Sequence, residues 1–314
     1  MNTMDLIYLI TFFLSILLNL FFQKYFIKKN KFDKAVSRSS HNVLATRSGG
    51  SAIFGTFFLL ILYFYIQSDQ FFDFSILIPL GILYTVGLYD DIYGVDFKLK
   101  FIFQLIVAKI IIDQGIIVET LNGFAGIYEI TYLISQIITI FLIVFIVNAT
   151  NFTDGIDGLA ITETLKFLIL IIVSSNGISA GYTFVFLTIS IALIPLYYFN
   201  FKRDNKVFLG DSGSLFLGGV VSVGLILFVN NAGSDAGINI STPILILLCY
   251  IYPIIDTIFV VTKRVLSGNS PFIADKSHIH HRLILKGYTH VQSLLIITGT
   301  TGIIQLILLR YITS

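Results

Sequence analysis

Long uninterrupted apolar runs separated by short polar loops dominate this sequence. The runs cover residues 4–22, 50–66, 71–89, 99–118, 130–148, 159–174, 181–199, 213–229, 243–262 and 291–311. Each is close to the ~20 residues with which an α-helix crosses a bilayer. The pattern therefore predicts an all-α polytopic membrane bundle of about ten spanning helices, or eleven, forming a single domain over residues 1–314.

Composition supports a membrane protein. The chain is 56% hydrophobic and 12% charged, with a net charge of +2, whereas soluble domains carry about 25% charged residues. No basic patch beyond the membrane-orienting charges indicates nucleic-acid binding. The single cysteine, Cys249, excludes an intramolecular disulfide and is expected to face lipid or to pack. Two pairs within helices, Lys109 with Asp113 and Glu163 with Lys166, are expected to form ion pairs.

Positive charges gather on one side of the predicted helices. The loops on that side hold Lys24, Lys28, Lys29, Lys31, Lys34, Arg38, Arg47, Lys98, Lys100, Lys202, Arg203, Lys206, Lys263, Arg264, Lys276, Arg282 and Lys286. Short cytoplasmic loops carry this excess in membrane proteins. We therefore predict that the N-terminus lies outside and that the loops after odd-numbered helices lie in the cytoplasm.

Four polar clusters follow odd-numbered helices and so reach the same predicted face. They are Asp90-Asp91, the run NATNFTDGIDG from Asn148 to Gly158, FLGDSGS from Phe208 to Ser214, and HIHH from His278 to His281. We expect these segments, which are far apart in the sequence, to converge on one cytoplasmic surface.

Carboxylates dominate the first three clusters. Asp90 and Asp91 end a helix, where paired acids are costly near a membrane unless a cation or phosphate chemistry uses them; two solvated acids are the alternative. Asp154 and Asp157 can project from one helix face, although helix capping also explains them. Asp211 opens a further helix, whose free N–H groups suit a phosphate; its alternative is again a cap.

The histidine cluster has two chemical interpretations. Its three imidazoles could bind a metal, but no cysteine or second histidine cluster completes a zinc site. We therefore favour anion contact or proton transfer, with a solvated loop as the alternative.

Together these motifs resemble the polyprenyl-phosphate N-acetylhexosamine-1-phosphate transferases of glycosyltransferase family 4. The matching segments, in order over nearly the whole chain, are RSSH at Arg38–His41, Gly49-Gly50, DDIYGVDFKLKFIFQ from Asp90 to Gln104, the DGIDG run, Asn200 through Lys206 to FLGDSGS, PIIDT at Pro253–Thr257, Arg264, and ADKSHIHHRL from Ala274 to Leu283. The resemblance implies transfer of a sugar 1-phosphate from UDP-N-acetylglucosamine or a related UDP-N-acetylhexosamine to undecaprenyl phosphate, with release of UMP. This reaction would begin a cell-envelope glycan, such as O antigen or teichoic acid, at the cytoplasmic face of a bacterial inner membrane, and the enzyme would act alone or as a homodimer.

The resemblance also implies roles for individual residues. Asp90, Asp91 and Asp211 would be catalytic, and Asp211, Asp91 and Asp154 would hold Mg²⁺ or Mn²⁺, since these ions prefer oxygen ligands. The substrate-binding residues would be Lys100, Asn148, Asn151, Asp154, Asp157, Lys206, Arg264, His278, His280 and His281. Which aspartate, if any, acts as a base stays open, because a phosphate monoester with a second pKa of about 6 has little proton to lose. Which helices form the lipid groove stays open too.

Three other classes compete with this interpretation. An intramembrane aspartyl protease would use Asp90 and Asp211, but it needs a glycine at Phe208 and leaves the DGIDG and HIHH runs unused. An ion-coupled transporter would place its acids near the membrane midplane, where only Asp256 comes close. An aspartate-rich prenyltransferase would need paired acidic repeats on two helices, which the sequence lacks.

Overall fold

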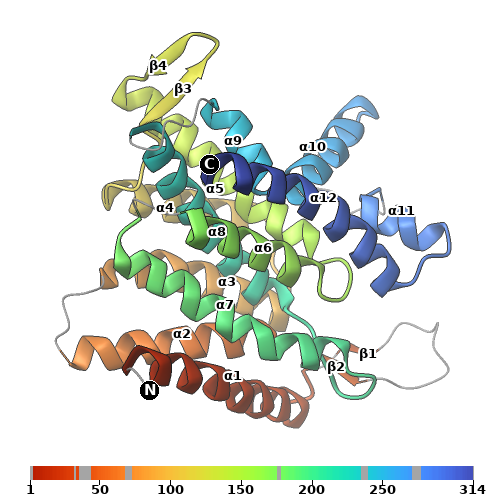
Figure 1. Cartoon of the computed structure of the whole chain (residues 1–314). Coiled ribbons are helices and arrows are strands. Elements are labelled where there is room, and N and C mark those ends of the chain that lie inside the picture. The colour runs from red at the N-terminus through yellow and green to blue at the C-terminus, as the bar shows by residue number, and fades with distance from the viewer. Residues whose placement is uncertain are drawn as a thin grey trace. The chain divides into compact units, whose positions relative to one another are not determined.

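The computed structural model describes residues 3–31, 33–34, 44–67, 73–174, 178–234, 240–270 and 277–313. It forms two compact units, of which unit 1 comprises residues 1–103 and 179–220 and unit 2 comprises residues 104–178 and 221–314 (Figure 1). The division falls within two helices, α4 (Phe97–Asp113) and α8 (Gly210–Ser234). The RSSH segment, Arg38–His41, lies outside the described residues.

Unit 1 is built from helices, with one short sheet. Besides the first parts of α4 and α8 it contains α1 (Thr3–Lys28), β1 (Asp33–Lys34), β2 (Leu44–Thr46), α2 (Gly49–Ile66), a 3₁₀ turn η1 (Phe74–Ile76), α3 (Leu77–Tyr93), α7 (Ala180–Phe201) and β5 (Lys206–Val207). Helices α1, α2 and α7 pack side by side (Figure 1).

Helix α1 shows how a membrane helix packs with its polar side inward. Thr11, Ser15, Asn19 and Gln23 recur every four residues and are buried, so they share one helix face. The Ser15 hydroxyl donates to the Ala192 carbonyl of α7 over 2.7 Å. Such small polar residues let helices approach and bond where lipid provides no hydrophobic drive between them.

The three-stranded sheet places the start of α2 next to the segment before α8. Strand β2 pairs antiparallel with β1 and parallel with β5. The amide groups of Gly49 and Gly50 then donate to the carbonyls of Phe208 and Leu209 over 3.0 and 2.9 Å. This backbone ladder holds the FLG turn that leads into Asp211. These strands, which the all-α prediction did not include, thus belong to the support of the site.

Unit 2 holds the remaining elements. Besides the rest of α4 and α8 they are β3 (Thr120–Phe124), β4 (Ile127–Glu129), α5 (Tyr132–Thr153), α6 (Leu159–Ser174), α9 (Thr242–Cys249), α10 (Ile251–Leu266), α11 (Ile279–Leu285) and α12 (His290–Thr313). Strands β3 and β4 form the antiparallel hairpin drawn in yellow in Figure 1. Helices α9 and α10 meet at Tyr250 with a bend of 103°.

Two ion pairs lie within helices of unit 2. The predicted pairs are confirmed: Lys166 Nζ lies 2.8 Å from Glu163 Oε1, and Lys109 bonds Asp113. Lys166 also donates to the Thr301 hydroxyl of α12 over 2.6 Å. Cys249 is fully buried, so its role is packing rather than lipid contact.

The prediction of a polytopic membrane protein is confirmed, whereas its helix count is not. Within the described residues, seven helices are long and apolar enough to cross a membrane, and the α9–α10 pair passes as an eighth if it forms one span. Helices α4 and α6, with 17 and 16 residues, are shorter than a typical span. The count of ten stays a prediction.

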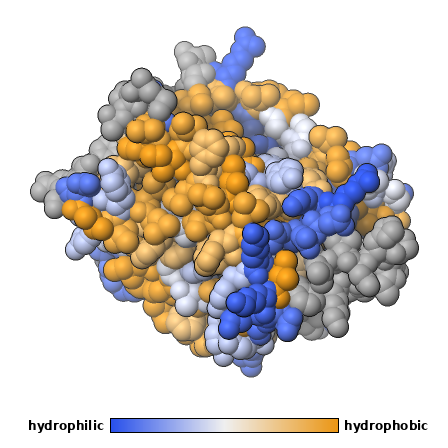
Figure 2. Space-filling model, turned by 90° about the horizontal axis from the view of Figure 1, so that it is seen from below, coloured by the Kyte–Doolittle hydropathy of each residue, from blue (hydrophilic) through white to orange (hydrophobic). Residues whose placement is uncertain are grey.

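Exposed apolar side chains cover the outside of these helices. Figure 2 shows a broad hydrophobic surface on the side where α1 and α2 lie. On α1 it includes Phe13, Leu17 and Phe21, which are 54%, 62% and 58% exposed. Monomeric soluble proteins rarely expose patches of this kind, so we assign the surface to lipid contact.

Candidate active site

Three charged residues of unit 1 form one hydrogen-bonded group. Lys100 Nζ lies 2.7 Å from Asp90 Oδ2 and also bonds Asp211 Oδ2. Asp90 ends α3, Lys100 lies in the first turn of α4, and Asp211 lies in the first turn of α8. Their side chains are 13%, 19% and 24% exposed, so the group is partly open to ligands. The structure thus brings together three of the predicted site residues.

Asp91 has a different environment from its neighbour. Its carboxylate is fully buried and accepts the backbone N–H groups of Asp211 and Ser212, each over 2.9 Å. It therefore caps α8 from another helix, and these two N–H groups do not bind a phosphate. The prediction that the start of this helix offers open N–H groups to a phosphate is therefore wrong for Asp211 and Ser212. Their N–H groups are already bonded to a carboxylate that lies far away in the sequence.

Gly87 makes this cap possible. A Cβ atom at this position would lie 2.3 Å from the Asp211 carbonyl oxygen and 2.6 Å from the Ser212 Cα atom. Only glycine lets the α3 backbone come this close to the first turn of α8. The close approach carries Asp90 and Asp91, one turn further on, to Asp211.

Charges in this group do not balance. Asp90, Asp91 and Asp211 contribute three carboxylates, while Lys100 and Arg47, whose Nη1 lies 3.9 Å from Asp91 Oδ1, contribute two cations. With every one of these groups in its charged form, one negative charge remains among the five residues. Asp90 and Asp211 offer partly exposed carboxylate oxygens. Mg²⁺ is usually bound by one or two such carboxylates, and its other ligands are waters and substrate oxygens. The residues therefore fit a divalent cation, with Asp91 less suited as a ligand because both its oxygens are occupied.

Lys206 lies in β5, two residues before Phe208. Its Nζ lies over the Phe208 ring, 5.5 Å from the centroid. The short sheet thus holds a third cation on the chain segment that leads to Asp211.

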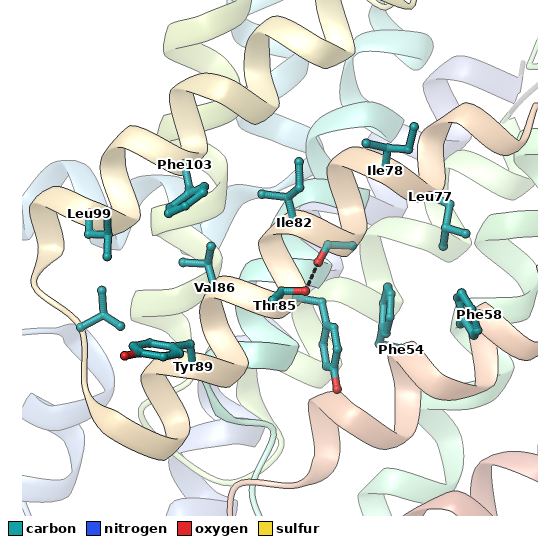
Figure 3. A pocket seen from close by; sticks show the side chains of 13 residues that line it. Phe54, Phe58, Leu77, Ile78, Ile82, Thr85, Val86, Tyr89, Leu99 and Phe103 are labelled. Carbon is teal, nitrogen blue, oxygen red and sulfur yellow. Dashed lines mark hydrogen bonds between the residues drawn. The ribbon is translucent and has the colours of Figure 1, made fainter.

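An apolar groove of about 640 Å³ runs along α3 in unit 1. Figure 3 shows Ile82, Val86 and Tyr89 of α3 between Phe54 and Phe58 of α2 and Leu99 and Phe103 of α4. The Thr85 hydroxyl donates to the Gly81 carbonyl over 2.7 Å, so it adds no open polar group. At one end Tyr89 and Val95 line the groove, and the Val95 amide donates to Asp90 Oδ1 over 2.5 Å. The groove therefore ends beside the charged group.

Unit 2 contains the asparagines and acids of the DGIDG run. Asn148 Nδ2 donates to Gln104 Oε1 over 2.7 Å, which joins α5 to α4. Asp154 is the C-cap residue of α5, three residues after the half-buried Asn151. Asp157 Oδ2 lies 3.0 Å from His290 Nδ1, a residue of α12 that the sequence did not single out.

Two of the three histidines are held by α10. His278 Nδ1 lies 2.6 Å from Asp256 Oδ2, and His280 Nδ1 lies 2.8 Å from the Tyr252 hydroxyl. Asp256, His278 and His280 offer possible metal ligands within 4.8 Å of one another, but the short contact shows that Asp256 and His278 bond each other. His281 packs against the His280 ring, with centroids 4.3 Å apart.

His280 serves as a packing residue. It is fully buried, and a Cβ atom at Gly155 would lie 2.0 Å from its Nε2. Burial, with a smaller contribution from the nearby His281, lowers the pKa of His280 to about 3. The ring is therefore neutral and fixes α11 against the DGIDG turn, for which Gly155 leaves the space.

Arg264 lies two turns after Asp256 on α10 and is 4% exposed. Its guanidinium lies over the Phe152 ring, 5.7 Å from the centroid, and the His278 ring lies 5.6 Å from the same ring. Arg264 and His278 thus flank one aromatic side chain of α5. Whether the charged groups of the two units meet, as the sequence predicts, stays a prediction.

Comparisons with known proteins identify the family. The family model described as glycosyl transferase family 4 matches residues 73–229. A Bacillus subtilis (strain 168) protein named probable undecaprenyl-phosphate N-acetylglucosaminyl 1-phosphate transferase is 32% identical over 277 residues, covering 86% of this chain and 74% of its own. The chain belongs to glycosyl transferase family 4. This membership favours a transferase over the protease and transporter alternatives.

Other relatives of this glycosyl transferase carry similar names. A Mycolicibacterium smegmatis decaprenyl-phosphate N-acetylglucosaminephosphotransferase is 29% identical over 73% of this chain and 61% of its own length. An undecaprenyl-phosphate alpha-N-acetylglucosaminyl 1-phosphate transferase of Escherichia coli (strain K12) is 29% identical over 92% of this chain and 79% of its own. With its apolar helices and bacterial relatives, this family 4 enzyme is a bacterial multi-pass membrane protein.

Residues missed by the sequence analysis are the ones that support the site residues. Arg47, Tyr252, Asp256 and His290 each contact a predicted site residue. Asp256 belongs to the PIIDT motif, which could have marked it. The other three carry no local signal, because their partners lie at least 28 residues away.

Proposed function

We propose that this enzyme transfers N-acetylglucosamine 1-phosphate, or a related N-acetylhexosamine 1-phosphate, from a UDP-sugar to undecaprenyl phosphate and releases UMP. The names of the relatives support the reaction class. The observation that carries the proposal is Lys100 between Asp90 and Asp211, a charged group suited to two phosphates. The reaction would take place at the cytoplasmic face of the inner membrane, where the lysines and arginines are predicted to lie, and would begin a cell-envelope glycan.

The proposed reaction balances at phosphorus. An oxygen of the lipid phosphate attacks the phosphorus that bears the sugar, and the bond from that phosphorus to the bridging oxygen breaks. The bridging oxygen leaves with UMP. The attacking phosphate is already largely ionised near neutral pH, its second pKa being about 6, so Asp90 need not remove a proton. Lys100 lowers the repulsion between the anions.

A divalent ion would complete the charge balance. Asp211 and Asp90 would hold Mg²⁺ or Mn²⁺, which would supply positive charge at the phosphate oxygens. Asp91 would then contribute indirectly, because it holds the backbone of Asp211 and Ser212 in place and does not itself bind the ion. Asp154 stays a proposed further ligand, and Asn148, Asn151, Asp157, Lys206 and Arg264 stay proposed substrate contacts.

The reaction is tested with purified protein, undecaprenyl phosphate and a panel of labelled UDP-sugars. We expect a lipid-linked sugar phosphate and one UMP per product, no turnover with EDTA, and reversal on addition of UMP. Lys100→Gln should lower kcat at least 100-fold, while Lys98→Gln, an exposed lysine on the same helix, should stay within twofold. UDP as the stoichiometric product would show attack at the sugar carbon and overturn the proposal.

The groove along α3 is the proposed site of the polyprenyl chain. Twelve residues separate Leu77 from Tyr89, so the groove extends about 18 Å at ~1.5 Å per residue. Its apolar lining suits an isoprenoid, and its end beside Asp90 and Lys100 places the terminal phosphate at the charged group. A single polyprenyl phosphate would thus fill the apolar groove with its chain and reach the charged group with its phosphate.

A bulky side chain in the groove should weaken binding of the acceptor only. We expect Thr85→Phe to raise KM for undecaprenyl phosphate at least tenfold and to leave KM for the UDP-sugar within twofold. Tenfold is about 1.4 kcal/mol, less than the loss of two buried CH₂ groups at about 0.8 kcal/mol each. Leu59→Phe, at an exposed residue of α2 that does not line the groove and points about 100° away from Phe58, is the control. An unchanged acceptor KM in an active Thr85→Phe protein would place the chain elsewhere and leave the reaction intact.

A further inference from the structure

Helix α10 holds the histidine segment at two points. Tyr252 and Asp256 are four residues apart and therefore lie on one face of the helix. Each bonds Nδ1 of one histidine, Tyr252 that of His280 and Asp256 that of His278. The PIIDT motif thus has a structural partner in the HIHH motif.

The Asp256 carboxylate fixes the chemical state of His278 as well as its position. Asp256 is 1% exposed, and its two oxygens accept bonds from His278 Nδ1 over 2.6 Å and from the Ile279 amide over 2.7 Å. A carboxylate can only accept, so Nδ1 must carry the proton. The tautomer of a histidine is set by such a partner. Nε2 is then the ring nitrogen left for other chemistry.

The two histidines consequently differ in role. His280 has Nδ1 on Tyr252 and Nε2 against Gly155, so both of its nitrogens serve the packing of unit 2. The His278 ring instead lies beside Phe152, the ring that Arg264 covers. Asp256 and Arg264, two turns apart, both lie on the buried side of α10. A guanidinium and an imidazole beside one aromatic ring suit an anionic ligand.

We propose that Asp256 is a positioning residue of the transfer reaction, which holds Nδ1 of His278 so that Nε2 meets a phosphate oxygen of the substrate. The proposal rests on the proposed function. Asp256 itself touches no substrate. With Nδ1 bonded to the Asp256 carboxylate, Nε2 can take up a second proton and donate it to the anion, because the carboxylate offsets the charge of the imidazolium. An Nε2–H tautomer without that carboxylate can only donate as a neutral ring.

Asp256→Asn is the sharpest test because it changes the tautomer with little change of shape. The amide oxygen can still accept the Ile279 N–H, which keeps the start of α11 in place. The amide NH₂ would face His278 and donate to Nδ1, which moves the ring proton to Nε2. We expect kcat/KM to fall about 10- to 100-fold, by analogy with the loss when a carboxylate that orients a metal-bound histidine is removed. Asp256→Glu keeps a carboxylate and should recover part of the loss.

A double-mutant cycle separates positioning from stability. If Asp256 acts through His278, Asp256→Asn should change activity less than twofold in a His278→Asn background. An equal loss in both backgrounds, or more than half of wild-type activity in Asp256→Asn, would overturn the proposal. If Asp256→Asn does not accumulate as folded protein, the cycle is run with Asp256→Glu.

A second measurement does not depend on turnover. In protein labelled with ¹⁵N-histidine, the His278 signals, assigned by their loss in His278→Asn, should report a protonated Nδ1 in the wild type and a protonated Nε2 in Asp256→Asn. Wild-type His278 protonated on Nε2 alone would overturn the proposal whatever the activity. Absence of UMP release from every UDP-sugar would instead contradict the proposed function, and the ¹⁵N result would still stand.

Discussion

Asp90 and Asp91 are neighbours in sequence, yet they face different partners because successive residues of a helix point about 100° apart. Asp90 faces Lys100 at the edge of the groove, while Asp91 is buried against the backbone of α8. Asp90 is thus placed to contact a ligand, whereas Asp91 supports the fold. Residue type alone does not distinguish these roles.

The amide variants of two acids should therefore fail in different ways. Asp211→Asn should abolish turnover with little change in melting temperature. Asp91→Asn should abolish turnover and also lower stability, since an amide oxygen can accept one of the two backbone N–H groups and its NH₂ opposes the other. An unsatisfied buried group costs about 1–3 kcal/mol. The two variants are compared by their melting temperatures in detergent and by their UMP release. Equal melting temperatures would contradict the capping role of Asp91.

The neutral His280 predicts a loss of stability in acid. Its folded pKa, lowered to about 3, lies below the unfolded value of about 6.5, so the unfolded chain binds the extra proton between these values. The contribution is complete above pH 6.5 and is lost as the pH falls towards 3, by about 2 kcal/mol at pH 5. Wild type should lose more stability between pH 7.5 and pH 5 than His280→Gln does. Parallel pH curves for the two proteins would show that His280 is not buried in its neutral form.

At the scale of elements, the positions of the charged groups depend on how closely the helix backbones approach one another. Helix α3 reaches α8 at Gly87, and α10 begins at the bend after α9 with the buried Tyr250. The sequence predicts most of these helices to within a few residues, because long apolar runs need no partner to be recognised. It treats 243–262 as one span, although Tyr250 breaks that run into two helices with a 103° bend.

Gly87 should accept no side chain. Gly87→Ala places a Cβ 2.3 Å from the Asp211 carbonyl oxygen, so α3 and α8 must separate. We expect a melting temperature at least 5 °C lower and no UMP release. Gly302→Ala in α12 is the control, because among the described residues its Cβ would meet no neighbouring element within 4 Å and Gly302 does not line the groove. Equal behaviour of the two variants would show that the close approach at Gly87 is not required.

At the scale of the whole molecule, membrane orientation is the prediction still to be tested. Cys249 is the single cysteine and is buried, so a Cys249→Ser background accepts new labelling sites. Asn205→Cys and Ser270→Cys should react only with reagents that enter the cytoplasm, because their loops carry lysine and arginine. Ser234→Cys should react from outside. Labelling of Asn205→Cys from outside would place Asp211 on the wrong face for a cytoplasmic UDP-sugar.

The sequence by itself determined that the chain is a multi-pass membrane protein of this family, because apolar length and contiguous motifs are local properties. It also predicted Asp90, Asp211 and Lys100 as site residues, and the structure brings these three side chains together. The tertiary structure alone decided their partners: Asp91 on the α8 backbone, Lys100 between two acids, and Asp256 on His278. The Asp91 contact spans 120 residues and the Asp256 contact 22. Such hydrogen bonds depend on how helices pack, which no local pattern of residues encodes.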